Sequence, residues 1–132
     1  MKQILILLLP VLMLSACTST GQTNSDGIKR VDVEEFNKAL SEADDKEVLV
    51  LDVRTPGEFA AGHLPGAVNI DWRSNNFLSQ CEMLNKAQTV FVYCGSGRRS
   101  AEAAKAMEQA GFTKLYDMEG GINAWKAKGL PY

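Results

Sequence analysis

A run of five residues, Thr89 to Tyr93 (TVFVY), most constrains what this chain can fold into. Its residues are apolar or β-branched, which is typical of a strand that is buried on both faces of a parallel sheet. The run leads directly into the loop Cys94–Ser100 (CGSGRRS), and good helix formers follow from Ser100 to Ala110 before Gly111 ends the pattern. A buried strand, a glycine-containing turn and a helix are therefore expected in immediate succession.

The chain before and after this unit alternates between similar strands and helices. We expect strands at Val48–Leu51, Ala67–Ile70 and Lys114–Met118, and helices at Val33–Glu42 and Ile122–Ala127. The first of these helices also carries a start signal, because the acidic pair Asp32 and Glu35 has the spacing of a capping box. Strands that alternate with helices predict an α/β domain with a mainly parallel sheet and helices on both faces.

The N-terminal segment predicts export. Lys2 is followed by the apolar run Ile4–Leu14, which is shorter than the roughly 20 residues that span a bilayer and fits a secretory signal. The tetrad Leu14-Ser15-Ala16-Cys17 resembles the lipobox of bacterial lipoproteins. That resemblance implies a signal peptide over residues 1–16, a lipidated Cys17, and a domain held at the membrane on the periplasmic side. The alternative is an ordinary signal that is cut before an incidental cysteine.

The residues after Cys17 refine this expectation. Thr18, in place of Asp, favours the outer membrane where a cell has two membranes, by the lipoprotein sorting pattern. Residues 18–27 are small and polar, so residues 17–27 are expected to form a flexible tether. The folded domain is then expected over residues 28–132.

Composition disfavours two classes of function. The net charge of −2 and the lack of a Lys/Arg run argue against a nucleic-acid partner. His63 is the only histidine, so the sequence offers no metal-ligand set, and neither a metal nor another cofactor is expected.

The loop Cys94–Ser100 has the character of an anion site. Backbone N–H groups in a turn that enters a helix, together with the helix dipole, favour negative charge. The same field stabilises a thiolate at Cys94. Gly95 and Gly97 allow close backbone approach, and Arg99 can present its planar fork to an oxyanion. Ser96, Arg98 and Ser100 complete the predicted substrate-binding loop.

Three segments, in the order of one known family, give this loop a context. Cys94-x-x-Gly97-x-Arg99-Ser100 resembles the active-site loop of the rhodanese superfamily. The run from Asp52 to Ile70 (DVRTPGEF followed by GHLPGAVNI) resembles its N-terminal signature, and the run from Gly120 to Trp125 (GGINAW) resembles its C-terminal one. The resemblance implies a five-stranded, mainly parallel sheet flanked by helices.

The resemblance also implies sulfur transfer. Cys94 would take a sulfane sulfur from thiosulfate or a related anionic donor as a persulfide, and pass it to a thiol or to cyanide. Gly95 departs from a common family form, which has Arg after the cysteine, and this weakens the expectation for doubly charged thiosulfate. A non-catalytic persulfide carrier, sensor or protein-binding module is the alternative. An anion-directed phosphatase or arsenate reductase is a third reading.

The remaining polar residues of the N-terminal signature are interpreted as structural support. Asp52, Arg54 and Glu58 are expected to form an ion-paired scaffold for neighbouring loops, with direct substrate contact as the alternative. His63 is expected to be hydrogen-bonded within its loop, in preference to acting as a base or a ligand. Cys81 is expected to be a buried packing residue, and the alternative is a resolving thiol that pairs with Cys94.

Overall fold

The computed structural model describes residues 27–132; the predicted signal peptide, Cys17 and the tether up to residue 26 lie outside them. In chain order the elements are β1 (Ile28–Val31), α1 (Val33–Glu42), β2 (Val48–Asp52), α2 (Pro56–Ala60), β3 (Val68–Asn69), α3 (Phe77–Cys81), β4 (Thr89–Tyr93), α4 (Arg98–Gln109), β5 (Leu115–Met118) and α5 (Gly121–Ala127). None of the helices in this part of the chain has the length and apolar character that crossing a bilayer requires.

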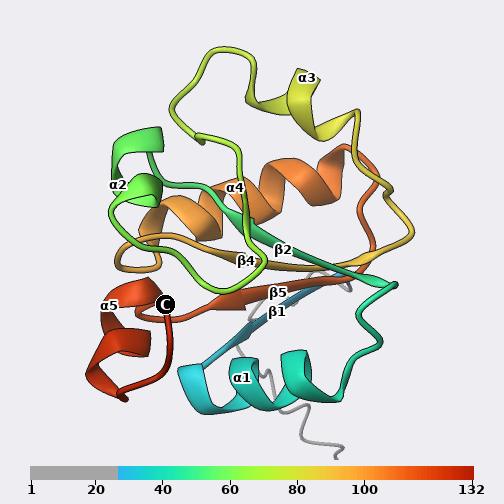
Figure 1. The fold of residues 1–132 in the computed structure, drawn as a ribbon. Helices are drawn as coiled ribbons and strands as arrows, with labels where there is room; N and C mark the ends of the chain where they lie inside the picture. Colours follow the sequence, from blue (N-terminus) through green and yellow to red (C-terminus); the bar gives the residue numbers. More distant parts are fainter. Residues whose placement is uncertain (1–26) are drawn as a thin grey trace, which may run out of the picture.

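The five strands form one parallel sheet in the order β1-β5-β4-β2-β3 (Figure 1). The apolar run that opened the sequence analysis becomes β4, the central strand, with its last four residues buried. Because all strands run the same way, their carboxyl ends meet at one edge of the sheet, which is where ligands bind in folds of this kind. The predicted α/β class with a five-stranded parallel sheet is confirmed.

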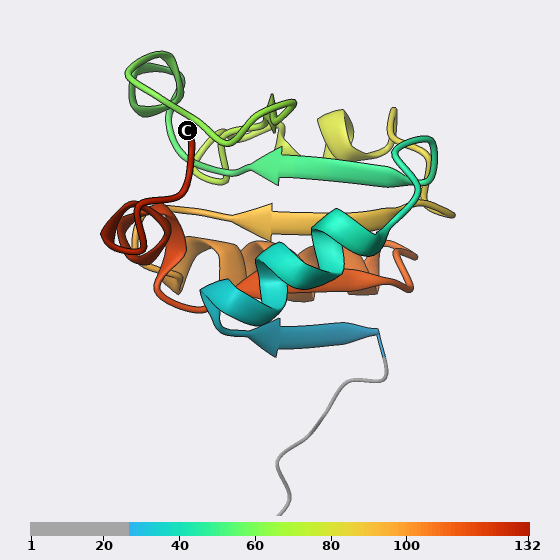
Figure 2. The ribbon, with the colours of Figure 1, turned by 60° about the horizontal axis from the view of Figure 1, so that its bottom comes forward.

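Helices cover both faces of the sheet. Turning the molecule brings α1 in front of the sheet and leaves α4 behind it (Figure 2). On the face of α1 and α5, the fully buried Phe36 meets Phe91 and Trp125 edge-on, with ring centroids 5.2 and 6.4 Å apart. On the face of α3 and α4, the buried Ala103 and Ala104 leave room for a close approach of helix and sheet.

Most of the predicted elements are found with small shifts at their ends. The first helix has the predicted bounds, and Asp32 caps it by accepting a hydrogen bond from the Glu35 N–H at 2.9 Å. The helix after the loop begins at Arg98, two positions before the predicted Ser100, and the strand expected over residues 67–70 is reduced to Val68–Asn69.

Three elements escaped the sequence analysis. The edge strand β1 carries the exposed Lys29 and Arg30 at its centre, so it lacks the apolar signal of a buried strand. Helices α2 and α3 have five residues each, which is too short for an amphipathic pattern to develop. The first of them begins with a capping box, in which Thr55 and Glu58 satisfy each other's backbone N–H groups.

Candidate active site

Cys94 lies at the carboxyl end of β4, at the centre of the sheet edge. Its side chain is fully buried, and its Sγ accepts a hydrogen bond from the Gly97 N–H at 3.1 Å. The loop folds back on the cysteine because Gly97 adopts a φ of +97°, a value that favours glycine. The sulfur therefore sits inside the turn that follows it.

The first turn of α5 orients the peptides of this loop. The N–H of Ile122 donates to the Cys94 carbonyl at 2.8 Å, and the N–H of Asn123 donates to the Gly95 carbonyl at 3.1 Å. Gly121 allows this approach, since a Cβ on it would lie 2.5 Å from both of these carbonyl oxygens. Its φ of +59° is also a left-handed value.

This arrangement leaves two N–H groups of the loop free. In a trans peptide the C=O and the following N–H point to opposite sides, and no described peptide bond is cis. With the Cys94 and Gly95 carbonyls directed at α5, the N–H groups of Gly95 and Ser96 point away from it. Neither finds an acceptor within residues 27–132. The loop thus offers unpaired donors for an anion.

Arg30 also holds this loop. Its Nη1 donates to the Gly97 carbonyl at 3.1 Å and also forms an ion pair with Asp117. Asp117 is buried in β5, and this burial raises the pKa of its carboxyl group. Ser100, in the first turn of α4, is fully buried, so its hydroxyl is covered by protein in this structure.

Arg99 uses its guanidinium fork within the protein. Its Nη1 and Nη2 donate to the two carboxylate oxygens of Glu58 at 2.8 and 3.0 Å. Hydrogen bonding from Arg99 lowers the pKa of Glu58 to about 2. Ser96 and Arg98 are exposed, and Arg98 forms no ion pair among the residues that the structure describes.

A buried network supports the loop that precedes α2. Both oxygens of the Asp52 carboxylate accept hydrogen bonds from Arg54, the shortest at 2.6 Å, and one also accepts from the Tyr93 hydroxyl at 2.7 Å. Arg54 donates in turn to the Gly62 carbonyl at 2.6 Å. Asp52 and Arg54 therefore link β2 to β4 and to the chain after α2.

The contacts of His63 are with a residue of its own loop region, Phe59. The Nδ1 of His63 is 2.9 Å from the Phe59 carbonyl oxygen, and its ring stacks on the Phe59 ring with centroids 3.8 Å apart. Cys81 is a fully buried free thiol in the core on the α4 face, and burial raises its pKa to about 11. A thiol of that pKa is protonated at neutral pH, which disfavours the resolving role for Cys81.

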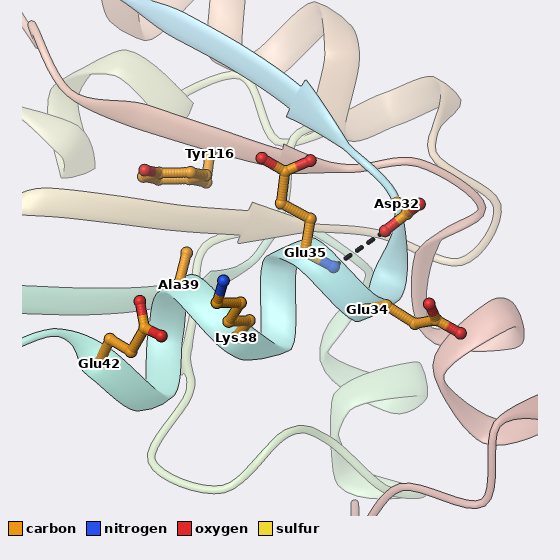
Figure 3. Close-up of a pocket in the computed structure, with 7 residues that line it drawn as sticks. All are labelled: Asp32, Glu34, Glu35, Lys38, Ala39, Glu42 and Tyr116. Atoms are coloured by element: carbon orange, nitrogen blue, oxygen red, sulfur yellow. Dashed lines mark hydrogen bonds between the residues drawn. The ribbon is translucent and has the colours of Figure 1, made fainter.

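A surface pocket elsewhere on the protein lacks the anion-binding character of the Cys94–Ser100 loop. It has a volume of about 510 Å³ and runs along α1 (Figure 3). Its lining includes four carboxylates and one lysine, and no residue of the Cys94–Ser100 loop: Asp32, Glu34, Glu35, Lys38, Ala39, Glu42 and Tyr116. Such a surface repels anions. Over residues 27–132, no three His, Cys, Asp or Glu side chains come together in a way that could hold a metal ion.

Sequence reasoning gave no role to three residues that shape the site. Arg30, Asp117 and Gly121 act on the loop from β1, β5 and the start of α5. One signal was available, since Asp117 is a carboxylate within a short, otherwise apolar and aromatic strand (LYDM). A buried carboxylate needs a partner, which here comes from the neighbouring strand.

Comparison with known proteins places this site in context. A family model described as Rhodanese-like domain matches residues 32–128. A sulfurtransferase of Allochromatium vinosum is 34% identical over 104 residues, which cover 79% of this chain and 94% of that protein. The chloroplastic thiosulfate sulfurtransferase 16 of Arabidopsis thaliana is 38% identical over 91 residues, covering 61% of this chain and 76% of that protein.

A solved structure agrees with these relatives. The crystal structure of a rhodanese-related protein from Thermoplasma volcanium superposes with a TM-score of 0.67 at 28% sequence identity. The match covers 78% of this chain and 95% of that chain.

The contact between α5 and the loop generates a prediction. Gly121→Ala places a Cβ against two carbonyl oxygens at a left-handed φ, so we expect it to lower the free energy of unfolding by about 2–4 kcal/mol. Gly57→Ala is the matched control, because nothing lies within 4 Å of a Cβ there, and it is expected to be neutral or to stabilise by up to about 1 kcal/mol. Urea unfolding followed by circular dichroism measures both. Equal stabilities for the two variants would contradict the tight contact.

Proposed function

The chain belongs to the rhodanese-like domain family, and from this membership we propose that it is a sulfurtransferase that carries a sulfane sulfur on Cys94. The observation that supports this most directly is the pair of free N–H groups, on Gly95 and Ser96, next to a cysteine whose Sγ already accepts the Gly97 N–H. Donors arranged in this way stabilise an anion without any proton transfer. A persulfide is such an anion, since it places negative charge on the sulfur beyond Sγ.

In the first half-reaction the Cys94 thiolate attacks the outer sulfur of the donor. With thiosulfate, the S–S bond of the donor breaks, its electron pair leaves with sulfite, and a new S–S bond forms to give Cys94–S–S⁻. The total charge is unchanged, and the leaving group needs no proton, so no general acid is required. The free N–H groups of the loop are placed to bind the anion during the transfer.

In the second half-reaction an acceptor takes the outer sulfur. A thiolate, or cyanide, attacks that sulfur, the Cys94 S–S bond breaks, and the Cys94 thiolate is regenerated. The outer sulfur lies about 2.05 Å beyond Sγ. Because Sγ itself is fully buried, the outer sulfur is the atom that an acceptor meets first.

A persulfide carrier is the second candidate function. The full burial of Cys94 favours it, since a sulfur enclosed by its own loop is protected from bulky acceptors. A carrier makes the same persulfide as an enzyme and differs in how fast it releases the sulfur.

We also propose that the domain is exported and anchored by lipid on Cys17. The proposal rests on the lipobox-like tetrad and on the polar residues 18–27 that follow it. Two or more acyl chains hold a protein firmly at a membrane, whereas one gives only marginal binding. The sulfur chemistry would then take place at the membrane surface, outside the cytoplasm.

The anchor is tested with the full chain expressed in a bacterium. We expect the wild type to incorporate labelled palmitate and to partition into the detergent phase, and Cys17→Ser to do neither. Cys81→Ala is the control for loss of a cysteine elsewhere and should behave as the wild type does. A wild-type chain that carries no label would refute the anchor.

The persulfide is tested by mass spectrometry of the intact protein. After incubation with thiosulfate and removal of excess donor, the wild type and Cys81→Ala should each gain one sulfur atom, and Cys94→Ser should gain none. Adding cyanide should then return the mass to its starting value with release of thiocyanate. Turnover over many cycles indicates an enzyme, and a single slow release indicates a carrier. A gain of sulfur by Cys94→Ser would rule out Cys94 as the acceptor.

A further inference from the structure

The guanidinium of Arg99, in the loop that follows Cys94, is already paired. The two donors of the Arg99 fork contact both oxygens of Glu58, at 2.8 and 3.0 Å. This pair lies against Gly95, because a Cβ on that residue would be 3.1 Å from Arg99 Nη2 and 3.9 Å from Glu58 Oε2. The ion pair therefore sits beside the residue that directly follows the reactive cysteine.

Glu58 keeps its charge under all ordinary conditions. Its pKa is about 2, so the carboxylate is ionised throughout the neutral range. The pKa of Arg99 is raised, first by the hydrogen bonds that it donates to Glu58, and with smaller contributions from the charges of Cys94 and Asp71. The Glu58–Arg99 pair is thus neutral as a whole, and a further carboxylate, that of Asp71, acts on it.

We propose that Glu58 determines substrate specificity by occupying Arg99, so that the site favours sulfane donors with one negative charge over doubly charged thiosulfate. Thiosulfonates and hydropersulfides are donors of the favoured class. This inference rests on the sulfurtransferase function proposed above and concerns its substrate.

The hydrogen-bond donors of the loop explain why a donor with one negative charge is preferred. The free N–H groups of Gly95 and Ser96 can bind one anionic group. A second full charge requires a cation, and the Arg99 fork reaches it only by giving up its two hydrogen bonds to Glu58. The coulombic penalty from the Glu58 carboxylate is also twice as large for a dianion as for a monoanion at the same place.

The favoured reaction balances in the same way as that of thiosulfate. The Cys94 thiolate attacks the outer sulfur of R–SO₂–S⁻, the S–S bond of the donor breaks, and its electron pair leaves with the sulfinate R–SO₂⁻. The products are Cys94–S–S⁻ and the sulfinate, so two negative charges stand on each side. No proton, oxidant or reductant is needed.

The test compares two donors that differ in charge and share the same reacting sulfur. Thiosulfate carries two negative charges, and methanethiosulfonate carries one. Glu58→Gln removes the charge and keeps the cap of α2, because glutamine serves equally in a capping box. The second-order rate constant of persulfide formation is measured for each donor with the full-length protein, from release of sulfite or methanesulfinate in a single turnover.

We expect Glu58→Gln to raise the rate constant about tenfold for thiosulfate and about threefold for methanethiosulfonate, since the logarithm of the gain scales with donor charge. Both increases should become smaller as the salt concentration is raised from about 0.01 to 1 M, because salt screens the electrostatic interaction with the donor. Glu82→Gln is the matched control. It also removes a paired glutamate, that of the Glu82–Lys86 pair, and this pair precedes the opposite end of β4. It should change neither constant.

Two other results would overturn the proposal. Equal changes in the rate constants of Glu58→Gln for the two donors would show that Glu58 acts through the shape of the site. A lower rate constant for thiosulfate would show that Glu58 holds Arg99 in its binding position. These results leave the sulfur chemistry of Cys94 intact. If the wild type accepts sulfur from neither donor, the proposed function itself fails, and the specificity proposal fails with it.

Discussion

Two hydrogen bonds from the first turn of α5 to the carbonyls of Cys94 and Gly95 set the direction of the two peptides that follow the reactive cysteine. Because trans peptides direct C=O and N–H to opposite sides, fixing the carbonyls on α5 also directs the free N–H groups of Gly95 and Ser96 away from that helix. The absence of a side chain at Gly121 makes this contact sterically possible. The anion site therefore depends on a helix that begins 27 residues after Cys94 in the sequence.

Three ion pairs lie around the loop. Asp52 is paired with Arg54, Glu58 with Arg99, and Asp117 with Arg30. The last two pairs join residues that are far apart in the sequence, and they reach the loop through Arg99 itself and through the hydrogen bond from Arg30 to the Gly97 carbonyl. Apart from the exposed Arg98, the described residues of the loop offer a substrate a set of backbone dipoles, which suits a sulfur atom with a single negative charge better than a densely charged anion.

The sequence predicted the centre of the fold better than its margins. The strand β4 and its loop were predictable because a buried apolar run followed by glycines has few other interpretations. The helix after Asp32 was predictable because its capping residues, Asp32 and Glu35, lie close together in the sequence. The edge strand β1, which pairs with β5, was missed because its exposed Lys29 and Arg30 interrupt the apolar pattern that identifies a buried strand. The Glu58–Arg99 ion pair joins residues 41 positions apart, and no local pattern reports such a contact.

The central claim is that the loop after β4 holds a persulfide on Cys94 with its own backbone donors. A crystal structure of the protein after exposure to a sulfane donor tests this most directly. The account predicts one additional sulfur bonded to Cys94 Sγ, within hydrogen-bonding distance of the Gly95 and Ser96 N–H groups. An unmodified Cys94 with sulfur bound at Cys81, or an outer sulfur turned away from those N–H groups, would contradict it.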